Sequence, residues 1–183
     1  QNQIETLKLG SANDRVAPID GGQFLGESGS IQAGDGIDTL DYSAYTSGVT
    51  VNLSAGTAQG IGSVSGLENI TGGNGDDTLT GDGAANVFIG GAGDDNLDGQ
   101  GGVDTFDASG TQNNLVVDLD AGTSVSDGSH LASDTGSDIL TNIENVITGS
   151  GNDRITGSLG DNVLTGGSGN DTYAFNDAWG VDQ

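Results

Sequence analysis

Aspartate and glycine recur together at a spacing of nine residues along the middle of this chain. Four nonapeptides fill residues 72–107 without a gap, and they read GGNGDDTLT, GDGAANVFI, GGAGDDNLD and GQGGVDTFD. Glycine comes first in each unit, Asp or Asn comes sixth, and a large apolar residue comes eighth. Calcium prefers carboxylate and carbonyl oxygens as ligands. The repeated units therefore predict a series of calcium-binding loops, each followed by a short strand.

The composition is strongly acidic and poor in apolar residues. The 183 residues include 35 glycines and carry a formal net charge of −24, and only 32% of them are hydrophobic. Low hydrophobicity with high net charge is typical of disordered chains. However, only four of the 27 acidic residues are glutamate, and the aspartates keep register with the glycines. We therefore expect a folded repeat in the presence of calcium and a disordered chain without it.

Several classes of function are disfavoured by what the chain lacks. Lys8, Arg15 and Arg154 are the only basic residues, too few to neutralise a nucleic-acid backbone. No apolar run approaches the roughly 20 residues that span a bilayer, so we expect no transmembrane segment. There is no cysteine, and the single histidine, His130, has no HExxH motif around it. We expect no catalytic residues and interpret the chain as a non-enzyme.

A larger block occurs twice along the chain. Residues 36–41, 49–58 and 67–81 align with residues 102–107, 115–124 and 143–157, with an insertion in the second copy within 126–136. A second nonapeptide run occupies residues 148–174, a single unit occupies 33–41, and fainter units occupy 9–17 and 18–26. We divide the chain into degenerate leading coils (1–32), a first block (33–107), a second block (108–175) and the start of a continuation or cap (176–183).

The fold class predicted from these repeats is all-β, a right-handed parallel β-roll or β-helix solenoid. Two nonapeptides make one coil of about 18 residues, and the eighth residue of each unit points inward because strand side chains alternate between faces. The segments between the runs alternate apolar and polar residues, and we interpret them as wider coils. Tyr42 and Tyr45 are expected to pack rather than to bind carbohydrate. The predicted inward row is Leu79, Phe88, Leu97 and Phe106, then Ile155, Leu164 and Tyr173.

Stacked coils would bring sixth-position residues together in pairs. Asp77 would lie above Asp95, Asn86 above Asp104, and Asp153 above Asp171. Two carboxylates about 5 Å apart repel each other by about 3 kcal/mol at an effective dielectric constant near 20. Calcium between them would reverse the sign of that interaction. Calcium accepts six to eight oxygens in flexible geometry, whereas magnesium demands a tight octahedron. Several calcium ions are therefore the expected cofactors, and their binding is expected to drive folding.

The units GGNGDDTLT, GGAGDDNLD and GGSGNDTYA resemble the RTX (repeats-in-toxin) family, whose consensus is Gly-Gly-x-Gly-x-Asp-x-apolar-x. The resemblance implies that the carbonyls of loop positions one to four and the sixth-position Asp coordinate calcium between neighbouring coils. The candidate ligands of the first run are Gly72, Gly73, Asn74, Gly75, Asp77, Gly81, Gly83, Asn86, Gly90, Gly91, Ala92, Gly93, Asp95, Gly99, Gly101 and Asp104. Those of the second run are Gly149, Gly151, Asp153, Gly157, Asn162, Gly166, Gly167, Ser168, Gly169 and Asp171. The isolated unit adds Gly34, Gly36 and Asp38.

Some units depart from the family consensus. Asn86 and Asn162 bring an oxygen without a charge, Ala84 replaces the fourth-position glycine, and Gln100 replaces the second. We expect the Asn86–Asp104 side to bind calcium more weakly or to lack an ion.

The resemblance also implies a context for the chain. RTX proteins are secreted by bacteria, leave the cytosol unfolded through a type I channel, and fold in millimolar calcium outside. We interpret this chain as a structural segment of an extracellular surface-layer, filament or adhesin component, with copies of itself as a further partner. The alternative is an accessory module of a secreted enzyme (metalloprotease, lipase or polysaccharide epimerase) or of a toxin. No C-terminal secretion signal is recognisable in 177–183, so we expect the sequence to be an excerpt.

Overall fold

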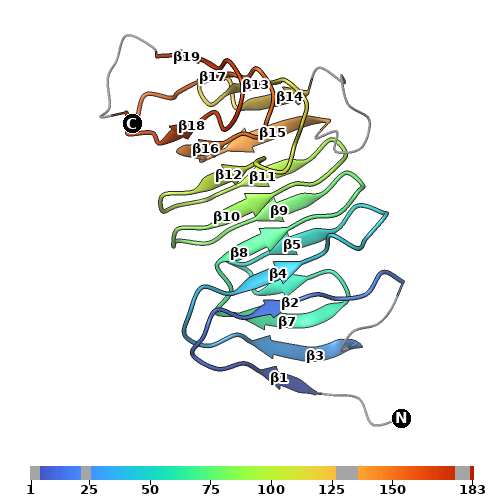
Figure 1. The fold of residues 1–183 in the computed structure, drawn as a ribbon. Helices are drawn as coiled ribbons and strands as arrows, with labels where there is room; N and C mark the ends of the chain where they lie inside the picture. The colour runs from blue at the N-terminus through green and yellow to red at the C-terminus, as the bar shows by residue number, and fades with distance from the viewer. Residues whose placement is uncertain (1–4, 22–25, 127–135, 176–181) are drawn as a thin grey trace.

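The chain advances from one end of the molecule to the other as a stack of short strands (Figure 1). The computed structural model describes residues 5–21, 26–126, 136–175 and 182–183. All regular secondary structure in these residues is β-strand, and the strands form two sheets. One apolar cluster takes side chains from both sheets, so the two sheets enclose a single narrow core. The all-β architecture predicted from the repeats is confirmed.

The seven-stranded sheet, here called sheet B, is parallel throughout. Its order is β18-β16-β12-β10-β8-β4-β2. The strands are β2 (Arg15–Val16), β4 (Thr39–Asp41), β8 (Asn69–Thr71), β10 (Val87–Ile89), β12 (Thr105–Asp107), β16 (Asn145–Ile147) and β18 (Leu164–Thr165).

The twelve-stranded sheet, here called sheet A, mixes parallel and antiparallel pairs. Its order is β1-β3-β7-β6-β5-β9-β11-β15-β14-β13-β17-β19. The strands are β1 (Thr6–Lys8), β3 (Gly26–Gln32), β5 (Thr50–Asn52), β6 (Thr57–Ala58), β7 (Ile61–Ser65), β9 (Thr78–Thr80), β11 (Asn96–Asp98), β13 (Leu115–Asp118), β14 (Thr123–Ser126), β15 (Ser137–Thr141), β17 (Arg154–Thr156) and β19 (Thr172–Ala174).

The 18-residue period sets the register in both nonapeptide runs. Thr78 of β9 pairs with Asn96 of β11, and Val87 of β10 pairs with Thr105 of β12. Of the predicted inward row, all but one side chain is buried: Leu79, Phe88, Leu97, Phe106, Ile155 and Leu164. Tyr173 is the exception, since 43% of it is exposed. Its strand β19 is the last of sheet A, and no further strand of this sheet covers it among the described residues.

The segments between the nonapeptide runs are not wider coils, as the alternating pattern had suggested. Each forms a three-stranded antiparallel meander within sheet A: β5-β6-β7 in the first block and β13-β14-β15 in the second. A tight turn reverses the chain after the first strand of each meander. In the first block the Gly56 amide donates to the Leu53 carbonyl (3.0 Å), and Gly56 has φ of +67°. Each meander therefore separates two runs of parallel rungs.

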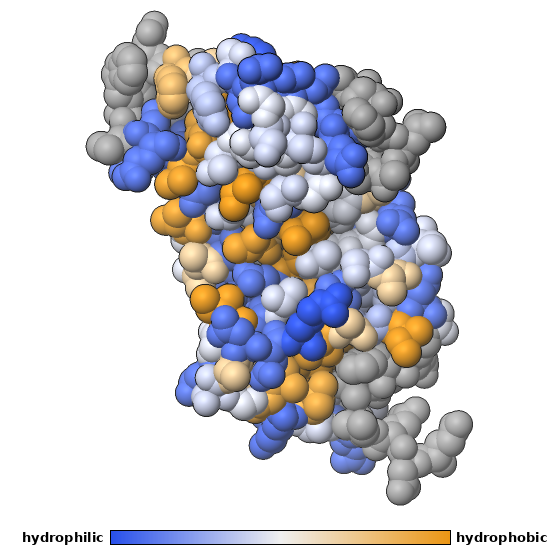
Figure 2. Space-filling view, in the orientation of Figure 1, coloured by the Kyte–Doolittle hydropathy of each residue, from blue (hydrophilic) through white to orange (hydrophobic). Residues whose placement is uncertain are grey.

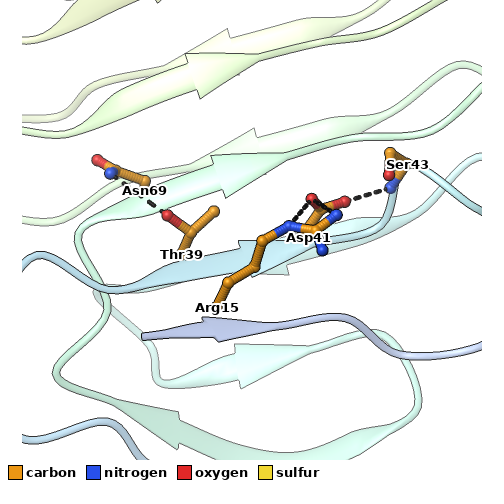
Figure 3. Close-up of polar contacts among 5 residues, drawn as sticks. All are labelled: Arg15, Thr39, Asp41, Ser43 and Asn69. Carbon is orange, nitrogen blue, oxygen red and sulfur yellow. Dashed lines mark hydrogen bonds and ion pairs between the residues drawn. The ribbon is translucent and has the colours of Figure 1, made fainter. Parts of the chain in front are cut away.

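An ion pair links neighbouring rungs of sheet B near its N-terminal end (Figure 3). Arg15 on β2 pairs with Asp41 on β4, and the other oxygen of Asp41 accepts a hydrogen bond from the Ser43 amide at 2.8 Å. On the next rung the Asn69 side chain reaches Thr39 at 3.5 Å. Asp41 thus fixes both the rung below it and the turn that follows β4.

The outer faces of the sheets carry a mixture of residue types. Figure 2 shows hydrophilic residues interspersed with apolar patches on one face of the molecule. Scattered exposed aliphatic side chains such as Val103 and Ile139 are ordinary for a protein surface. Within the described residues there is no helix long and apolar enough to cross a bilayer.

Candidate calcium-binding site

The glycine-rich loops stack in two columns, one on each side of the core. We call the loops that lead into sheet A column A and those that lead into sheet B column B. In both columns an oxygen-bearing side chain lies beside the neighbouring rung. Most of these residues immediately precede a strand, although Asp138 lies within β15 and one residue separates Asn162 from β18. In column A these residues are Asp77, Asp95 and Asp138, and then Asp153 and Asp171. In column B they are Asp14, Asp38, Glu68, Asn86, Asp104, Glu144, Asn162 and Asp182.

A ladder of hydrogen bonds joins these side chains from rung to rung. The Asp77 amide donates to Asp95 Oδ1 at 2.8 Å, and the Asn86 amide donates to Asp104 Oδ1 at 2.7 Å. In the second run the Asp153 amide donates to Asp171 Oδ1 at 3.0 Å. The three stacked pairs expected from the repeat period are therefore confirmed. In the first two pairs, the second carboxylate oxygen of the accepting residue, Oδ2 of Asp95 and of Asp104, makes no hydrogen bond among the described residues.

Those second oxygens are buried and unsatisfied at several rungs. Among the described residues, the Oδ2 atoms of Asp38, Asp95, Asp104 and Asp153 are buried and have no hydrogen-bond partner. A buried carboxylate oxygen without a partner is costly. Because unpartnered carboxylate oxygens recur at the same position of several rungs, they indicate sites at which a ligand binds.

Glycine is required where the loops of neighbouring rungs approach each other. Gly91 and Gly93 have φ of +107° and +115°, a region that disfavours residues with a Cβ. A Cβ on Gly91 would also collide with the Gly73 carbonyl oxygen one rung away. A Cβ on Gly72 would meet both Asp77 Oδ2 and the Gly90 carbonyl oxygen. The first-position glycine thus leaves a space at which carboxylate and carbonyl oxygens converge.

Burial also shifts the protonation of these carboxylates. Burial raises the pKa of Asp95 to about 7, with a further contribution from the negative charges of Asp77, Asp76 and Asp94. Burial raises the pKa of Asp104 to about 6, and it raises the pKa of Asp77 as well. A desolvated carboxylate surrounded by like charges is stabilised by either a proton or a metal cation.

The donor set fits a hard cation that accepts main-chain oxygens. Within the described residues, no three Asp, Glu, His or Cys side chains gather at one point. A bound ion would therefore combine one or two carboxylates with loop carbonyls. That mixture suits calcium, which accepts carboxylate and backbone oxygens in flexible geometry.

The structure brings together the candidate loops in three pairs. Loop 72–77 lies on loop 90–95, loop 81–86 on loop 99–104, and loop 148–153 on loop 166–171, as shown by amide-to-carbonyl bonds of 2.8–3.1 Å between them. Gly34, Gly36 and Asp38 stack instead on the fainter unit 9–17, where the Asp14 amide donates to Asp38 Oδ1 at 2.8 Å. Gly157 and Asn162 belong to a loop whose next rung contributes Asp182, at 3.2 Å from the Asn162 amide.

Besides Asp182, three acids outside the nonapeptides occupy the columns, and the repeat pattern did not predict them. Glu68 and Glu144 accept the amides of Asp38 and Asp104, each at 2.8 Å, and Asp138 accepts the Asp95 amide at 3.2 Å. A sequence signal existed, because each of these acids precedes a buried apolar residue by two positions. The residues concerned are Ile70, Val146 and Leu140. The nonapeptide acids have the same spacing to their inward residues.

The two asparagines of column B are more than uncharged substitutes for aspartate. The Asn86 amide group donates to the Glu68 carbonyl at 2.8 Å, and the Asn162 amide group donates to the Glu144 carbonyl at 2.8 Å. A carboxylate cannot donate these bonds. Column B therefore repeats the order Asp, Glu, Asn. In each repeat the Asn side chain donates a hydrogen bond to the main-chain carbonyl of the Glu on the neighbouring rung.

Comparison with known families agrees with this geometry. The family described as RTX calcium-binding nonapeptide repeat (4 copies) matches residues 71–106, 80–113 and 142–175. A search of curated proteins found no significant match. The matched segments contain all three pairs of stacked candidate loops. The repeats of this chain therefore belong to the RTX calcium-binding nonapeptide family.

Proposed function

We propose that this chain is a calcium-stabilised β-solenoid segment of an extracellular protein, of the surface-layer, filament or adhesin type, that folds on binding calcium after secretion. The observation that carries the proposal is the ladder of buried, unsatisfied carboxylate oxygens along the two columns. A chain with a net charge of −24 must otherwise hold those acids together against their mutual repulsion. The RTX repeats are structural units, and we propose that the chain has no catalytic activity of its own.

Ions would lie between the three pairs of stacked loops. Between loops 72–77 and 90–95, Asp77, Asp95 and the glycine-loop carbonyls would hold calcium, and loops 148–153 and 166–171 offer the same set through Asp153 and Asp171. Between loops 81–86 and 99–104, Asp104 is the only sixth-position carboxylate, because the sixth residue of the other loop is Asn86. The side-chain amide of Asn86 donates to the Glu68 carbonyl. Calcium would supply the positive charge that offsets the desolvation of these groups.

The calcium concentration outside a cell suits such a folding switch. Extracellular calcium modules have dissociation constants of about 10⁻⁴–10⁻³ M, and an unfolded chain has no preformed site, so binding free energy becomes folding free energy. The acid repulsion that opposes folding in the cytosol would then keep the chain unfolded for export. Millimolar calcium would fold it on the far side of the membrane.

A calcium titration followed by far-ultraviolet circular dichroism tests this proposal. In calcium-free buffer the spectrum should be that of coil, and β structure should appear with a midpoint of about 10⁻⁴–10⁻³ M calcium. Magnesium at the same concentrations serves as the control and should produce little β structure. A chain that is already folded without calcium, or that folds below micromolar calcium, would contradict an export-coupled switch.

We further propose that copies of the chain associate end to end. In the described residues the outermost strands of sheet A are β1 and β19, and an outermost strand presents unpaired N–H and C=O groups to another chain. Multi-angle light scattering with and without calcium measures this directly. Association is expected only in calcium, and a strictly monomeric folded chain at high concentration would refute it.

A further inference from the structure

The fifth residue of each nonapeptide loop in column A also joins neighbouring rungs. In the first run the Asp94 amide donates to Asp76 Oδ1 at 2.9 Å, and in the second run the Asn170 amide donates to Asn152 Oδ1 at 2.8 Å. All four of these residues are exposed, and each comes directly before a sixth-position aspartate. We call the fifth-position side chains the outer ladder and the sixth-position side chains the inner ladder.

The two ladders have opposite directions of donation. In the first run the inner ladder runs from the Asp77 amide to Asp95 Oδ1 at 2.8 Å, whereas the outer ladder runs back from the Asp94 amide to Asp76 Oδ1. The second run has the same pair of opposed bonds. Each pair of stacked loops is therefore joined by two side chains, one from each loop.

The outer ladder requires an Oδ1 atom but no charge. It extends by one more rung in each block, because the Ser137 amide donates to Asp94 Oδ1 at 2.9 Å and the Asn152 amide donates to Asn114 Oδ1 at 2.6 Å. Aspartate and asparagine both present a side-chain oxygen that accepts such a bond. An exchange of one for the other therefore preserves the bond and changes only the charge of the ladder.

The two runs differ in the charge of their outer ladders. The paired loops of the first run in column A contain four acidic side chains, and those of the second run contain two. The difference lies entirely at the fifth position, where the first run has Asp76 and Asp94 and the second has Asn152 and Asn170. Two loop pairs with the same opposed bonds thus differ by two negative charges.

The outer charges act on the inner ladder. Burial raises the pKa of Asp95, and the negative charges of Asp77, Asp76 and Asp94 raise it further. A cation beside Asp95 would be attracted by the same charges, because a field of one sign raises the local concentration of the opposite ion. The affinity of calcium loops also depends on how many charges surround the ion.

We propose that Asp76 and Asp94 strengthen calcium binding between loops 72–77 and 90–95 through their charge, so that these loops bind calcium at a lower concentration than the paired loops of the second run. The inference rests on the proposed binding of calcium by the columns. The two outer carboxylates attract the ion without contacting it, since each is exposed and uses Oδ1 in the outer ladder. Rising calcium therefore orders the first run before the second.

The double substitution Asp76→Asn with Asp94→Asn tests the proposal, because it gives the first run the outer ladder of the second. Calcium titration followed by amide NMR measures the two runs separately, through the Asp77 and Asp153 signals of the folded chain. In the unaltered chain the Asp77 signal should reach its midpoint at about fivefold lower calcium. The double substitution should raise the Asp77 midpoint by about fivefold and change the Asp153 midpoint by less than about twofold.

Several outcomes of this titration would overturn the proposal. They are equal midpoints in the unaltered chain, an unchanged Asp77 midpoint in the double variant, and an equal shift of the Asp77 and Asp153 signals. Loss of folding at saturating calcium would overturn it too, because the carboxylates would then be needed for the structure itself. Folded signals in calcium-free buffer would instead refute the calcium-driven folding on which the proposal rests.

The reverse change, Asn152→Asp with Asn170→Asp, adds the outer charges to the second run. It should lower the Asp153 midpoint by about fivefold. Raising sodium chloride from about 0.05 M to about 0.5 M should reduce the effect of either double substitution, because salt screens exposed charges. An effect of either substitution that is independent of salt would show that it acts through something other than charge.

The matched control is Asp35→Asn with Asp120→Asn, which removes two exposed acids that lie in neither pair of loops. Both midpoints should stay within about twofold of those of the unaltered chain. If this control raises the Asp77 midpoint as much as Asp76→Asn with Asp94→Asn does, net charge rather than the outer ladder determines the affinity, and the proposal is wrong.

Discussion

The main-chain amide of Asp77 donates to Oδ1 of Asp95 at 2.8 Å, although 18 residues separate the two in sequence. This bond occupies one carboxylate oxygen, and the second, Oδ2 of Asp95, is buried without a partner among the described residues. The ladder therefore gives the two oxygens of Asp95 different roles. One oxygen sets the distance between rungs, and the other faces the space in which a cation would bind.

Asp95→Asn tests that division because it preserves Oδ1 and removes only the charge. We expect the calcium midpoint of folding to rise by about tenfold, equivalent to about 1.4 kcal/mol, because the ion loses a carboxylate. In calcium-free buffer the same substitution should stabilise any residual β structure, since it removes a desolvated charge. Circular dichroism titrations measure both effects.

The matched control is Asp98→Asn, three residues further along the same rung. Asp98 is partly exposed and its carboxylate accepts bonds from Gln100 and Asn142, so it serves a turn rather than a column. Its calcium midpoint should change by less than about twofold. Equal effects of the two substitutions would show that the column register does not determine calcium binding.

Asn86→Asp gives a prediction opposite to that of the family consensus. The change restores the sixth-position aspartate of the repeat. However, the Glu68 carbonyl accepts a hydrogen bond of 2.8 Å from the Asn86 side chain, and the substitution replaces that donor with a carboxylate. We expect the folded state in calcium to lose about 1–3 kcal/mol, measured by urea denaturation. Asn96→Asp adds the same charge at an exposed position of strand β11, outside the candidate loops, and should be close to neutral. A gain of stability in Asn86→Asp would mean that an ion replaces the lost bond.

The sequence predicted the periodic part of this molecule and failed where the period breaks. The pairing of Thr78 with Asn96 follows from the nonapeptide length alone, because two units return the chain to the same sheet. The alternation of Val49, Val51 and Leu53 specifies a half-buried strand, but this pattern is the same for parallel and antiparallel neighbours. The turn at Gly56 makes the next strand antiparallel, and the alternation of apolar and polar residues carries no information about that turn.

The acids between the runs were missed for a related reason. Glu68 and Glu144 follow meanders rather than glycine loops, so no nonapeptide contains them. Their place in column B depends on contacts with Asp38 and Asp104, which lie 30 and 40 residues away in sequence. The exposure of Tyr173 likewise depends on the absence of a following strand of sheet A in the described residues, which its own unit does not encode.

The raised pKa values of Asp95 (about 7) and Asp104 (about 6) predict opposite pH dependence with and without calcium. An unfolded aspartate has a pKa near about 3.9, so the calcium-free folded state binds more protons than the unfolded state between about pH 4 and pH 7. Its stability is therefore greatest at the acid end of this window and falls as the pH rises through it. Calcium competes with the same protons, so the calcium midpoint should fall by about tenfold between pH 5.5 and pH 7.5.

Circular dichroism in buffers stripped of calcium, and calcium titrations across the same pH range, check both signs. Asp95→Asn should weaken the pH dependence of both the stability and the calcium midpoint, because it removes the aspartate with the higher of the two pKa values. A calcium midpoint independent of pH, or β structure that strengthens with rising pH in the absence of calcium, would show that protons and calcium do not share these oxygens.

Gly91→Ala tests the convergence of the loops without touching any carboxylate. Gly91 has φ of +107°, and a Cβ there would strike the Gly73 carbonyl oxygen of the neighbouring rung, so the alanine must push apart two loops that would share an ion. We expect the calcium midpoint to rise by at least about tenfold, since a strained backbone alone costs about 1–2 kcal/mol. Gly101→Ala is the control, because a Cβ there has nothing within 4 Å and its φ is not positive. If both alanines shift the midpoint equally, the glycines act through chain flexibility rather than through the close approach of the rungs.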